Sequence, residues 1–240
     1  MNIALLGYGK MGHAIEEIAI QRQHNIVCTV GIENLEDRTD ENIKKADVVI
    51  EFSSPDSAYE NVMFCLHNKV PVVCGSTGWL DKYGQVKKYC EENNGGLIYA
   101  SNFSVGVNIF FALNRKLAQL MAPHHDYSVE LKEIHHTQKL DAPSGTAISL
   151  AQQVMEHIGY KKKWVNNPSD NKNELVIISE RKDPAPGTHV VNYHSDIDDI
   201  CIMHTAHNRK GFATGAVLAA EFLAKRKSGV YGMEEVLGIE

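Results

Sequence analysis

Short apolar segments alternate with stretches of helical spacing along the first hundred residues of the chain. The apolar segments are residues 3–6, 26–30, 48–52, 70–74 and 97–100. Between most of them, apolar side chains recur three or four positions apart, which is the spacing of an amphipathic helix. Short buried strands that alternate with helices predict βαβ units and a parallel sheet covered on both faces. Residues 31–45 are the exception, because this polar connection predicts at most a short helix.

The pattern changes after residue 96. Residues 105–120 predict one long helix, whereas residues 128–134 alternate apolar and polar positions, as a strand solvated on one face does. Further strand-like runs lie at 174–179, 189–193 and 197–204, and residues 161–173 are typical of a polar loop. We therefore expect an α/β fold of two domains. Residues 1–104 form the first, to which residues 211–240 return, and residues 105–210 form an α+β domain with an open mixed sheet.

The composition fits a globular chain and excludes several classes of protein. The 240 residues are 43% hydrophobic and 22% charged, with a formal net charge of −6, which argues against binding of nucleic-acid phosphates. The five cysteines include no C-x-x-C pair, so neither a zinc ribbon nor a disulfide framework is expected. No apolar run is long enough to span a bilayer, and the N-terminus lacks the features of a secretory signal. We expect a cytoplasmic protein that binds neither nucleic acid nor a membrane.

A glycine-rich sequence follows the first predicted strand and begins the first helix. It reads Gly7, Tyr8, Gly9, Lys10, Met11, Gly12, which matches G-x-G-x-x-G. In that pattern the first glycine permits a tight turn, the second lets the backbone approach a pyrophosphate, and the third allows close helix packing. The amides at the helix N-terminus then face the phosphates. A plain glycine turn is the alternative, but the position at the start of a βαβ series favours dinucleotide binding and a Rossmann-type domain.

The acidic residue that contacts the ribose in such domains is displaced in this sequence. It is expected at the end of the second strand, about 20 residues beyond the glycines. Gly31 occupies that place, and Glu33 is the nearest candidate. Lys10 is a candidate for a 2′-phosphate instead, so the sequence leaves the choice between NADH and NADPH open.

Residues 133–147 contain a second group of side chains that could bind a ligand or transfer a proton. His135, His136 and Lys139 fall within five positions just after a predicted strand. Ser144 is placed to cap the next helix, and the amides of Gly145 and Thr146 would then accept an anion. A lysine beside a helix N-terminus suits a carboxylate, and a histidine can supply a proton near neutral pH. The alternative is a capped helix beside a hydrated loop.

A metal site is the other interpretation of a chain with twelve histidines. The pairs to consider are His204 with His207, and His135 with His136. Adjacent residues rarely bind one metal ion, and no H-E-x-x-H spacing is present. We expect no metal.

Together these motifs resemble the 4-hydroxy-tetrahydrodipicolinate reductase (dihydrodipicolinate reductase) family. The resemblance rests on residues 7–12, 75–78, 100–108 and 133–147, and on the pattern from His204 to Ala216. It implies reduction of a cyclic dicarboxylate by NADH or NADPH with loss of water, in diaminopimelate and lysine biosynthesis. It also makes the second domain a substrate-binding and oligomerisation domain, through whose open sheet the subunits form a homotetramer.

The resemblance further implies roles for individual residues. His135 matches the general acid, Lys139 its partner toward substrate, and His136 with the turn Ser144, Gly145 and Thr146 the groups that hold the carboxylates. The residues implied on the cofactor side, besides the glycine loop and Glu33, are Gly75, Ser76, Thr77, Ala100, Ser101, Asn102, Phe103 and Arg209. Two alternatives remain: another nicotinamide-dependent dehydrogenase of amino-acid metabolism, such as an aspartate or homoserine dehydrogenase, or a non-catalytic dinucleotide-binding regulator.

Overall fold

The structure is a computed structural model that describes residues 1–208 and 210–239. It divides into two compact units, Met1–Val105 with Lys210–Glu240, and Gly106–Arg209. Arg209, one of the expected cofactor residues, lies outside the described residues. Within the described residues, no helix has the length and apolar character that crossing a membrane requires.

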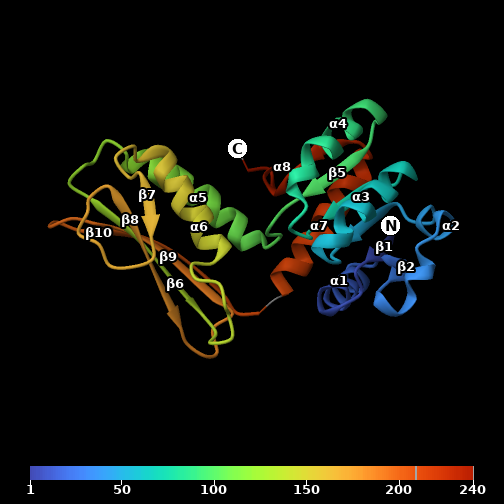
Figure 1. The fold of residues 1–240 in the computed structure, drawn as a ribbon, viewed down its shortest axis with the longest axis horizontal. Helices are drawn as coiled ribbons and strands as arrows, with labels where there is room; N and C mark the ends of the chain where they lie inside the picture. Colours follow the sequence, from blue (N-terminus) through green and yellow to red (C-terminus); the bar gives the residue numbers. More distant parts are fainter. Residues whose placement is uncertain (209, 240) are drawn as a thin grey trace. The chain divides into compact units, whose positions relative to one another are not determined.

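The first unit is a parallel sheet with helices on both faces (Figure 1). Its strands are β1 (Asn2–Leu6), β2 (Asn25–Val30), β3 (Val48–Glu51), β4 (Val72–Cys74), β5 (Gly96–Tyr99) and β11 (Gly229–Tyr231), in the order β11-β5-β4-β3-β1-β2. Its helices are α1 (Lys10–Gln21), α2 (Asp40–Ile43), α3 (Pro55–His67), α4 (Tyr83–Asn93), α7 (Lys210–Arg226) and α8 (Met233–Leu237), with 3₁₀ turns at Ile32–Asp37 and Leu80–Lys82. The Rossmann-type sheet expected from the sequence is confirmed.

Alternate residues of these strands feed two separate cores, because successive side chains of a strand point to opposite faces. On β1, Ile3 and Leu5 pack with α1 and α7, whereas Ala4 and Leu6 pack with α3 and α4. Both faces are covered, so most strand positions are apolar, although β3 ends in the buried Glu51. The expected return of the last long helix is confirmed, since α7 contributes buried residues from Ala213 to Leu223 to the core that it shares with α1.

The second unit is a mixed sheet with two helices on one face (Figure 1). The helices are α5 (Val105–Met121) and α6 (Gly145–His157), and the strands are β6 (Ser128–His135), β7 (Lys163–Val165), β8 (Glu174–Arg181), β9 (Gly187–His194) and β10 (Asp199–Ala206). Their order is β10-β9-β6-β8-β7, with antiparallel pairing on one side of β6 and parallel pairing on the other. The expected α+β domain with an open mixed sheet is confirmed.

The sequence pattern was wrong at three places. The polar segment 161–173 contains the edge strand β7, and β11 was not expected at all. Both are only three residues long, which is too short for a periodic pattern to develop. The last strand of the second sheet begins at Asp199, because Ile197 lies in the preceding turn and is almost fully exposed.

Candidate functional site

The glycine loop lies between β1 and α1, and each of its glycines has a different steric environment. Gly7 has a φ of +96°, and a Cβ there would lie 2.1 Å from the carbonyl oxygen of Phe52. A Cβ on Gly12 would lie 2.5 Å from the carbonyl oxygen of Gly7. A Cβ on Gly9 would meet no atom within 4 Å. The outer glycines therefore allow the loop to fold tightly, while Gly9 leaves open space over the first turn of α1.

That first turn is well suited to an anion. Helix α1 begins at Lys10, with Gly9 at the N-cap position, so the first amides of the helix have no partner within it. Two contacts fix the side chain of Tyr8, which is part of this loop: its hydroxyl donates to Glu16, and its ring packs on His13 with 4.1 Å between centroids. The geometry fits the pyrophosphate of a dinucleotide.

The other expected cofactor residues follow the carboxyl ends of neighbouring strands, which is where ligands bind in open parallel sheets. Gly75 follows β4, and a Cβ there would collide with the Phe52 ring at 2.2 Å. Thr77 and Ser101 are exposed, and Ala100 and Asn102 are half-buried. Ser76 and Phe103 differ, because their side chains are buried and Phe103 packs in the core of the unit.

The end of β2 carries no acidic side chain. Gly31 is the N-cap of the 3₁₀ turn Ile32–Asp37, and its amide donates to Asn34 Oδ1 at 2.7 Å. Glu33 is exposed on that turn. The structure therefore agrees with the sequence: the acidic residue is displaced from the end of β2 to the following turn.

In the second unit, the helix-covered face of the sheet changes from apolar to polar along the strands. On β6 the inward positions are Val129 and Leu131, followed by Glu133 and His135. On β8 the inward positions change from Leu175 and Ile177 to Ser179 and Arg181. On β9, which is antiparallel to β6, the apolar positions are Tyr193 and Val191 and the polar one is His189. Pairing places Glu133 beside both Ser179 and His189, and His135 beside Arg181. A compact polar cluster follows, which we call the β6 cluster: Glu133, His135, Ser179, Arg181 and His189.

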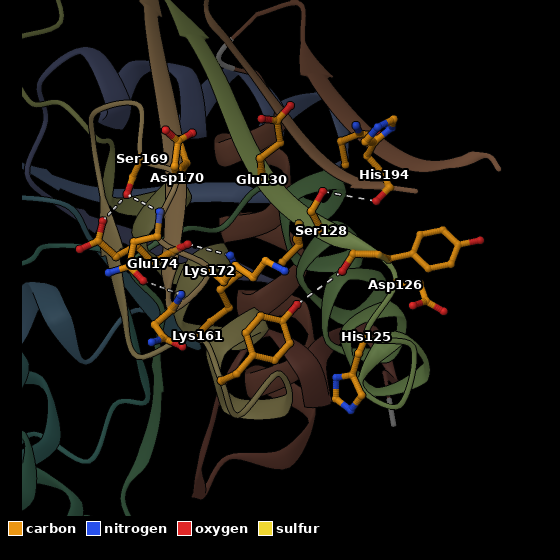
Figure 2. A pocket seen from close by; sticks show the side chains of 17 residues that line it. His125, Asp126, Ser128, Glu130, Lys161, Ser169, Asp170, Lys172, Glu174 and His194 are labelled. Carbon is orange, nitrogen blue, oxygen red and sulfur yellow. Dashed lines mark hydrogen bonds between the residues drawn. The ribbon is translucent and has the colours of Figure 1, made fainter. Parts of the chain in front are cut away.

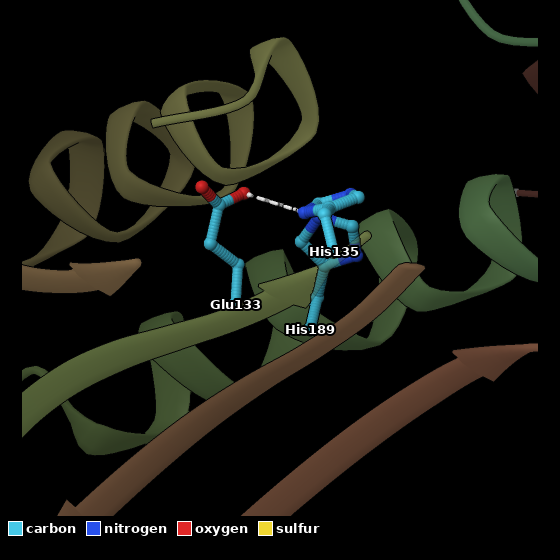
Figure 3. A group of neighbouring side chains, drawn as sticks. All are labelled: Glu133, His135 and His189. Carbon is cyan, nitrogen blue, oxygen red and sulfur yellow. Dashed lines mark ion pairs between the residues drawn. The ribbon is translucent and has the colours of Figure 1, made fainter. Parts of the chain in front are cut away.

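The carboxylate of Glu133 is the centre of the β6 cluster (Figure 3). It is fully buried and accepts hydrogen bonds from the Ser144 amide at 3.1 Å and from Ser179 Oγ at 2.7 Å. Nδ1 of His135 lies 3.4 Å from Oε2 of Glu133, and Nε2 of His189 lies 3.7 Å from the same oxygen. The Arg181 guanidinium approaches Oε1 to 3.7 Å.

These contacts shift the pKa values of the cluster in different directions. Burial opposes the charged form of Glu133, but the hydrogen bonds from Ser144 and Ser179 outweigh it and lower the pKa of this carboxyl. Burial lowers the pKa of His135, while the charge of Glu133 acts in the opposite direction. Burial, followed by the neighbouring His135, lowers the pKa of His189 to about 4.

The ligand atoms of Glu133, His135 and His189 lie within 4.8 Å of one another, close enough to hold a metal ion. However, hydrogen-bond donors already contact the carboxylate, and Arg181 places a positive charge 3.7 Å from it. A divalent cation would be repelled by that charge. The arrangement is that of a hydrogen-bonded ion-pair network, and we assign no metal to it.

The loop after β6 carries the remaining expected substrate residues. Lys139 Nζ contacts both carboxylate oxygens of Asp141 at 2.8 Å. His136 is half-buried beside it. The expected cap is confirmed, because Ser144 Oγ accepts from the Ala147 amide at the start of α6.

The amide and the hydroxyl of Ser144 are therefore already engaged within the protein. Its amide donates to Glu133, and its hydroxyl contacts both the Ala147 amide and Nε2 of His189. Gly145 is exposed and Thr146 is half-buried at the first turn of α6. The accessible amides at this helix N-terminus are those of Gly145 and Thr146.

Sequence reasoning predicted His135 and Lys139 but missed the other four members of the β6 cluster, which are Glu133, Ser179, Arg181 and His189. A signal for Glu133 was present, since it continues the inward alternation of Val129 and Leu131 with a charged residue. His189 gave no comparable signal, because its meeting with Glu133 depends on the register of β6 with β9.

A cavity of about 840 Å³ lies at the other end of β6 (Figure 2). It is lined by residues 125–130 and 169–174, among others. Several of its polar groups bond to one another: Lys161 Nζ donates to the Glu174 carbonyl at 2.7 Å, and Ser169 Oγ to the Glu174 carboxylate at 2.6 Å. None of the expected site residues lines it, so the β6 cluster and the glycine loop remain the candidate sites.

Known proteins resemble this chain over both units. Residues 1–103 match the family description "Dihydrodipicolinate reductase, N-terminus" and residues 106–237 match "Dihydrodipicolinate reductase, C-terminus". The 4-hydroxy-tetrahydrodipicolinate reductase of Christiangramia forsetii is 51% identical over 237 residues, which are 99% of this chain and 98% of that protein. The enzyme of the same name from Methanoregula boonei is 36% identical over 82% of this chain and 77% of its own length.

A solved structure extends the likeness to three dimensions. The dipicolinate-bound dihydrodipicolinate reductase from Paenisporosarcina sp. TG-14 has a TM-score of 0.78 and 26% identity, with 98% of each chain covered. The match spans both units, and the N-terminal family description precedes the C-terminal one along the chain. The chain therefore belongs to the dihydrodipicolinate reductase family.

Proposed function

We propose that this chain reduces 4-hydroxy-tetrahydrodipicolinate to tetrahydrodipicolinate with loss of water, using NADH or NADPH, in diaminopimelate and lysine biosynthesis. Membership of the reductase family supports the reaction. The observation that carries the proposal is the β6 cluster, which puts a buried carboxylate and a histidine beside a lysine-bearing loop and a helix N-terminus. A dehydrogenase or a regulator that shares only the first domain has no need of that arrangement.

The first unit would hold the cofactor. The open space over Gly9 and the unpaired amides at the start of α1 fit a pyrophosphate, and Gly75, Thr77 and residues 100–102 lie at the carboxyl ends of β4 and β5. When bound, the nicotinamide ring supplies the hydride. Glu33 is exposed on the turn after β2 and Lys10 on the glycine loop, so we propose that both NADH and NADPH are accepted.

In this proposal His135 is the general acid. The reaction consumes one hydride and one proton and releases one water, so a group must deliver the proton as negative charge develops on the ring. A positioned acid contributes about 10²–10⁴ in rate. His135 is buried next to Glu133, which supports its protonated form, and after transfer the neutral ring regains a proton from solvent.

We assign the two substrate carboxylates to the loop after β6 and to the start of α6. The ammonium group of Lys139 can exchange its contact with Asp141 for a substrate carboxylate, since Asp141 is largely exposed. The amides of Gly145 and Thr146 offer a second anion site at the helix N-terminus. His136 stands beside this loop, and Ser144 shapes the site through its cap.

The test is NAD(P)H oxidation by the purified protein, coupled to a synthase that forms the unstable substrate in place. We expect turnover, and we expect His135→Ala to lower kcat by about 10²–10⁴ with modest effect on the affinity for pyridine-2,6-dicarboxylate. His157→Ala is the matched control, because this exposed histidine lies at the opposite end of α6. Absence of turnover with intact cofactor binding would favour the regulator, and normal turnover by His135→Ala would remove the acid role.

A homotetramer is part of the same proposal. The face of the second sheet that α5 and α6 leave uncovered carries Ile134, Ile178, Val190 and Met203, of which Met203 is 66% exposed. Exposed apolar patches of this kind mark interaction surfaces. Light scattering should give four times the 26.7 kDa chain mass. Met203→Asp should reduce that mass, whereas Ile20→Asp, which changes an exposed isoleucine of α1, should not.

We also propose that the protein works in the cytoplasm, without nucleic-acid or membrane partners. All five cysteines are free thiols, as a reducing compartment requires. The net charge of −6 disfavours binding to phosphate backbones. Fractionation of cells that express the chain would check the location.

A further inference from the structure

Glu133 is a charged residue in a position where the fold expects an apolar one. It is fully buried on the helix-covered face of β6, in line with the core residues Val129 and Leu131. A buried carboxylate remains charged only when donors surround it, and the Ser144 amide, Ser179 Oγ and Arg181 do so here. We propose that Glu133 is a positioning residue, which holds the His135 ring in one orientation and keeps it able to carry a proton. This rests on the general-acid role of His135 in the proposed function.

The geometry assigns one end of the imidazole to Glu133. Nδ1 of His135 faces Oε2 of Glu133 at 3.4 Å (Figure 3), and among the described residues this buried nitrogen has no hydrogen-bond partner, so the carboxylate acts on it as an ion-pair partner that favours a proton on Nδ1. The opposite nitrogen, Nε2, lies where a Cβ on Gly187 would be 3.1 Å away. The absence of a side chain at Gly187 therefore leaves room at Nε2. Glu133 thereby fixes which nitrogen keeps its proton and which one is left to exchange it.

Two histidines share the Glu133 oxygen, but only one of them can be charged. The rings of His135 and His189 are 5.1 Å apart in an edge-on arrangement, so two imidazolium ions would repel each other. His189 is enclosed between Glu133 and Ser144, and burial lowers its pKa to about 4. His189 is thus neutral near pH 7, and the negative charge of Glu133 is available to His135.

The titratable groups around His135 come from β6, β8 and β9 and from the loop after β6. Glu133 from β6 and Asp141 from the following loop favour the imidazolium, whereas Lys139 from that loop, Arg181 from β8 and burial oppose it. His189 from β9 is neutral, and His204 of β10 acts on His189. Asp141 is largely exposed and already bound to Lys139. Glu133 is therefore the main support of the acid form, and without its charge the acid form would survive only at lower pH.

The experiment measures the pKa of His135 directly, by NMR titration of ¹³C-histidine-labelled protein, with His135→Ala used to assign the signal. In Glu133→Gln the pKa should fall by at least about one pH unit, the lower end of the effect of a neighbouring opposite charge. The pH at which kcat declines should fall by the same amount, with at least about a tenfold loss of kcat above it. Glu156→Gln is the matched control, because it makes the same change at an exposed site on α6.

Two further variants separate charge from structural damage. Glu133→Asp keeps the charge and should recover most of the pKa and of the pH profile. Ser179→Ala removes one hydrogen bond to the carboxylate but leaves the charge in place, so the His135 pKa should not fall. Binding of pyridine-2,6-dicarboxylate within about threefold of wild type would show that the loop and the start of α6 are intact.

The outcomes are distinct. An unchanged His135 pKa in Glu133→Gln, or an equal fall in Ser179→Ala, overturns the inference, because the carboxylate would then serve only the packing of the cluster. A fall in pKa without movement of the kcat profile overturns the acid role of His135, which belongs to the proposed function, and leaves Glu133 as the group that sets its protonation.

Discussion

The contact between Lys139 and Asp141 gives the sharpest prediction about substrate binding. Lys139 Nζ lies 2.8 Å from both oxygens of Asp141, and its side chain is only 23% exposed, whereas that of Asp141 is 59% exposed. Arg181 braces this loop through hydrogen bonds to the Lys139 and Asp141 carbonyls. A bound dicarboxylate would have to take the place of Asp141. The two side chains should therefore have opposite effects on ligand affinity.

The magnitudes follow from the exposure of the pair. Losing the charge-assisted contact of Lys139 to a carboxylate costs about 1.5–3 kcal/mol, which is about a ten- to more than a hundredfold rise in Kd for Lys139→Ala. The competing pair is solvent-exposed on one side and is worth about 0.2–1 kcal/mol. Asp141→Asn should therefore tighten binding by about one and a half- to fivefold, since the lysine no longer has to leave a partner.

The assay is calorimetric titration with pyridine-2,6-dicarboxylate in the presence of saturating NADH, at constant ionic strength because exposed charges are screened by salt. The double variant Lys139→Ala with Asp141→Asn completes a cycle. If Asp141 acts only by occupying Lys139, its removal has no effect once the lysine is gone. Lys163→Ala is the matched control, because Lys163 forms a similar pair with Glu174 at 2.9 Å in the same unit.

Two results would refute this reasoning. If Asp141→Asn weakened the inhibitor as much as Lys139→Ala does, Asp141 would be part of the binding site and not a competitor. If Lys139→Ala bound the inhibitor as wild type does while His135→Ala lost it, the roles assigned to the lysine and the histidine would be reversed.

Four further predictions concern the first unit. Gly9→Asp should fold normally, since a Cβ there meets no atom within 4 Å, yet it should abolish the fluorescence titration with NADH and NADPH. Gly7→Ala should lower the free energy of unfolding by at least about 1–3 kcal/mol in denaturant melts, because its φ is +96°. The kcat/KM values for NADH and NADPH should agree within about a hundredfold, or about 2.7 kcal/mol, and a larger ratio would exclude dual use. Arg22 lowers the pKa of Glu221, so this carboxylate stabilises the fold above its unfolded pKa and loses that effect as the pH falls through its folded pKa; urea melts should show Glu221→Gln about 1 kcal/mol less stable at pH 7, with a difference from wild type that shrinks as the pH is lowered.

Much of the fold was predictable because it depends on patterns local to the chain. The apolar runs of β1 and β3, the helical spacing of α1 and the alternation of β6 each appear within a dozen residues. Short edge strands were not predictable, since β11 pairs with β5 more than a hundred residues away and has only three residues in which to show a pattern. The burial of individual side chains within a motif was not predictable either: Ser76 and Phe103 were expected on the cofactor side, but their side chains are buried.

Neighbours along the chain are enough to predict the alternation of strands and helices, the tight turn at Gly7, the cap at Ser144, and the closeness of His135 at the end of β6 to Lys139 in the loop that follows. The surroundings of His135, in contrast, depend on contacts between distant parts of the chain. Glu133 and His189 are separated by more than fifty residues and meet through the register of β6 with β9, and Ser179 joins them from β8. The pKa of an imidazole depends on burial and on charges within a few ångströms, and those quantities exist only once the sheet has formed.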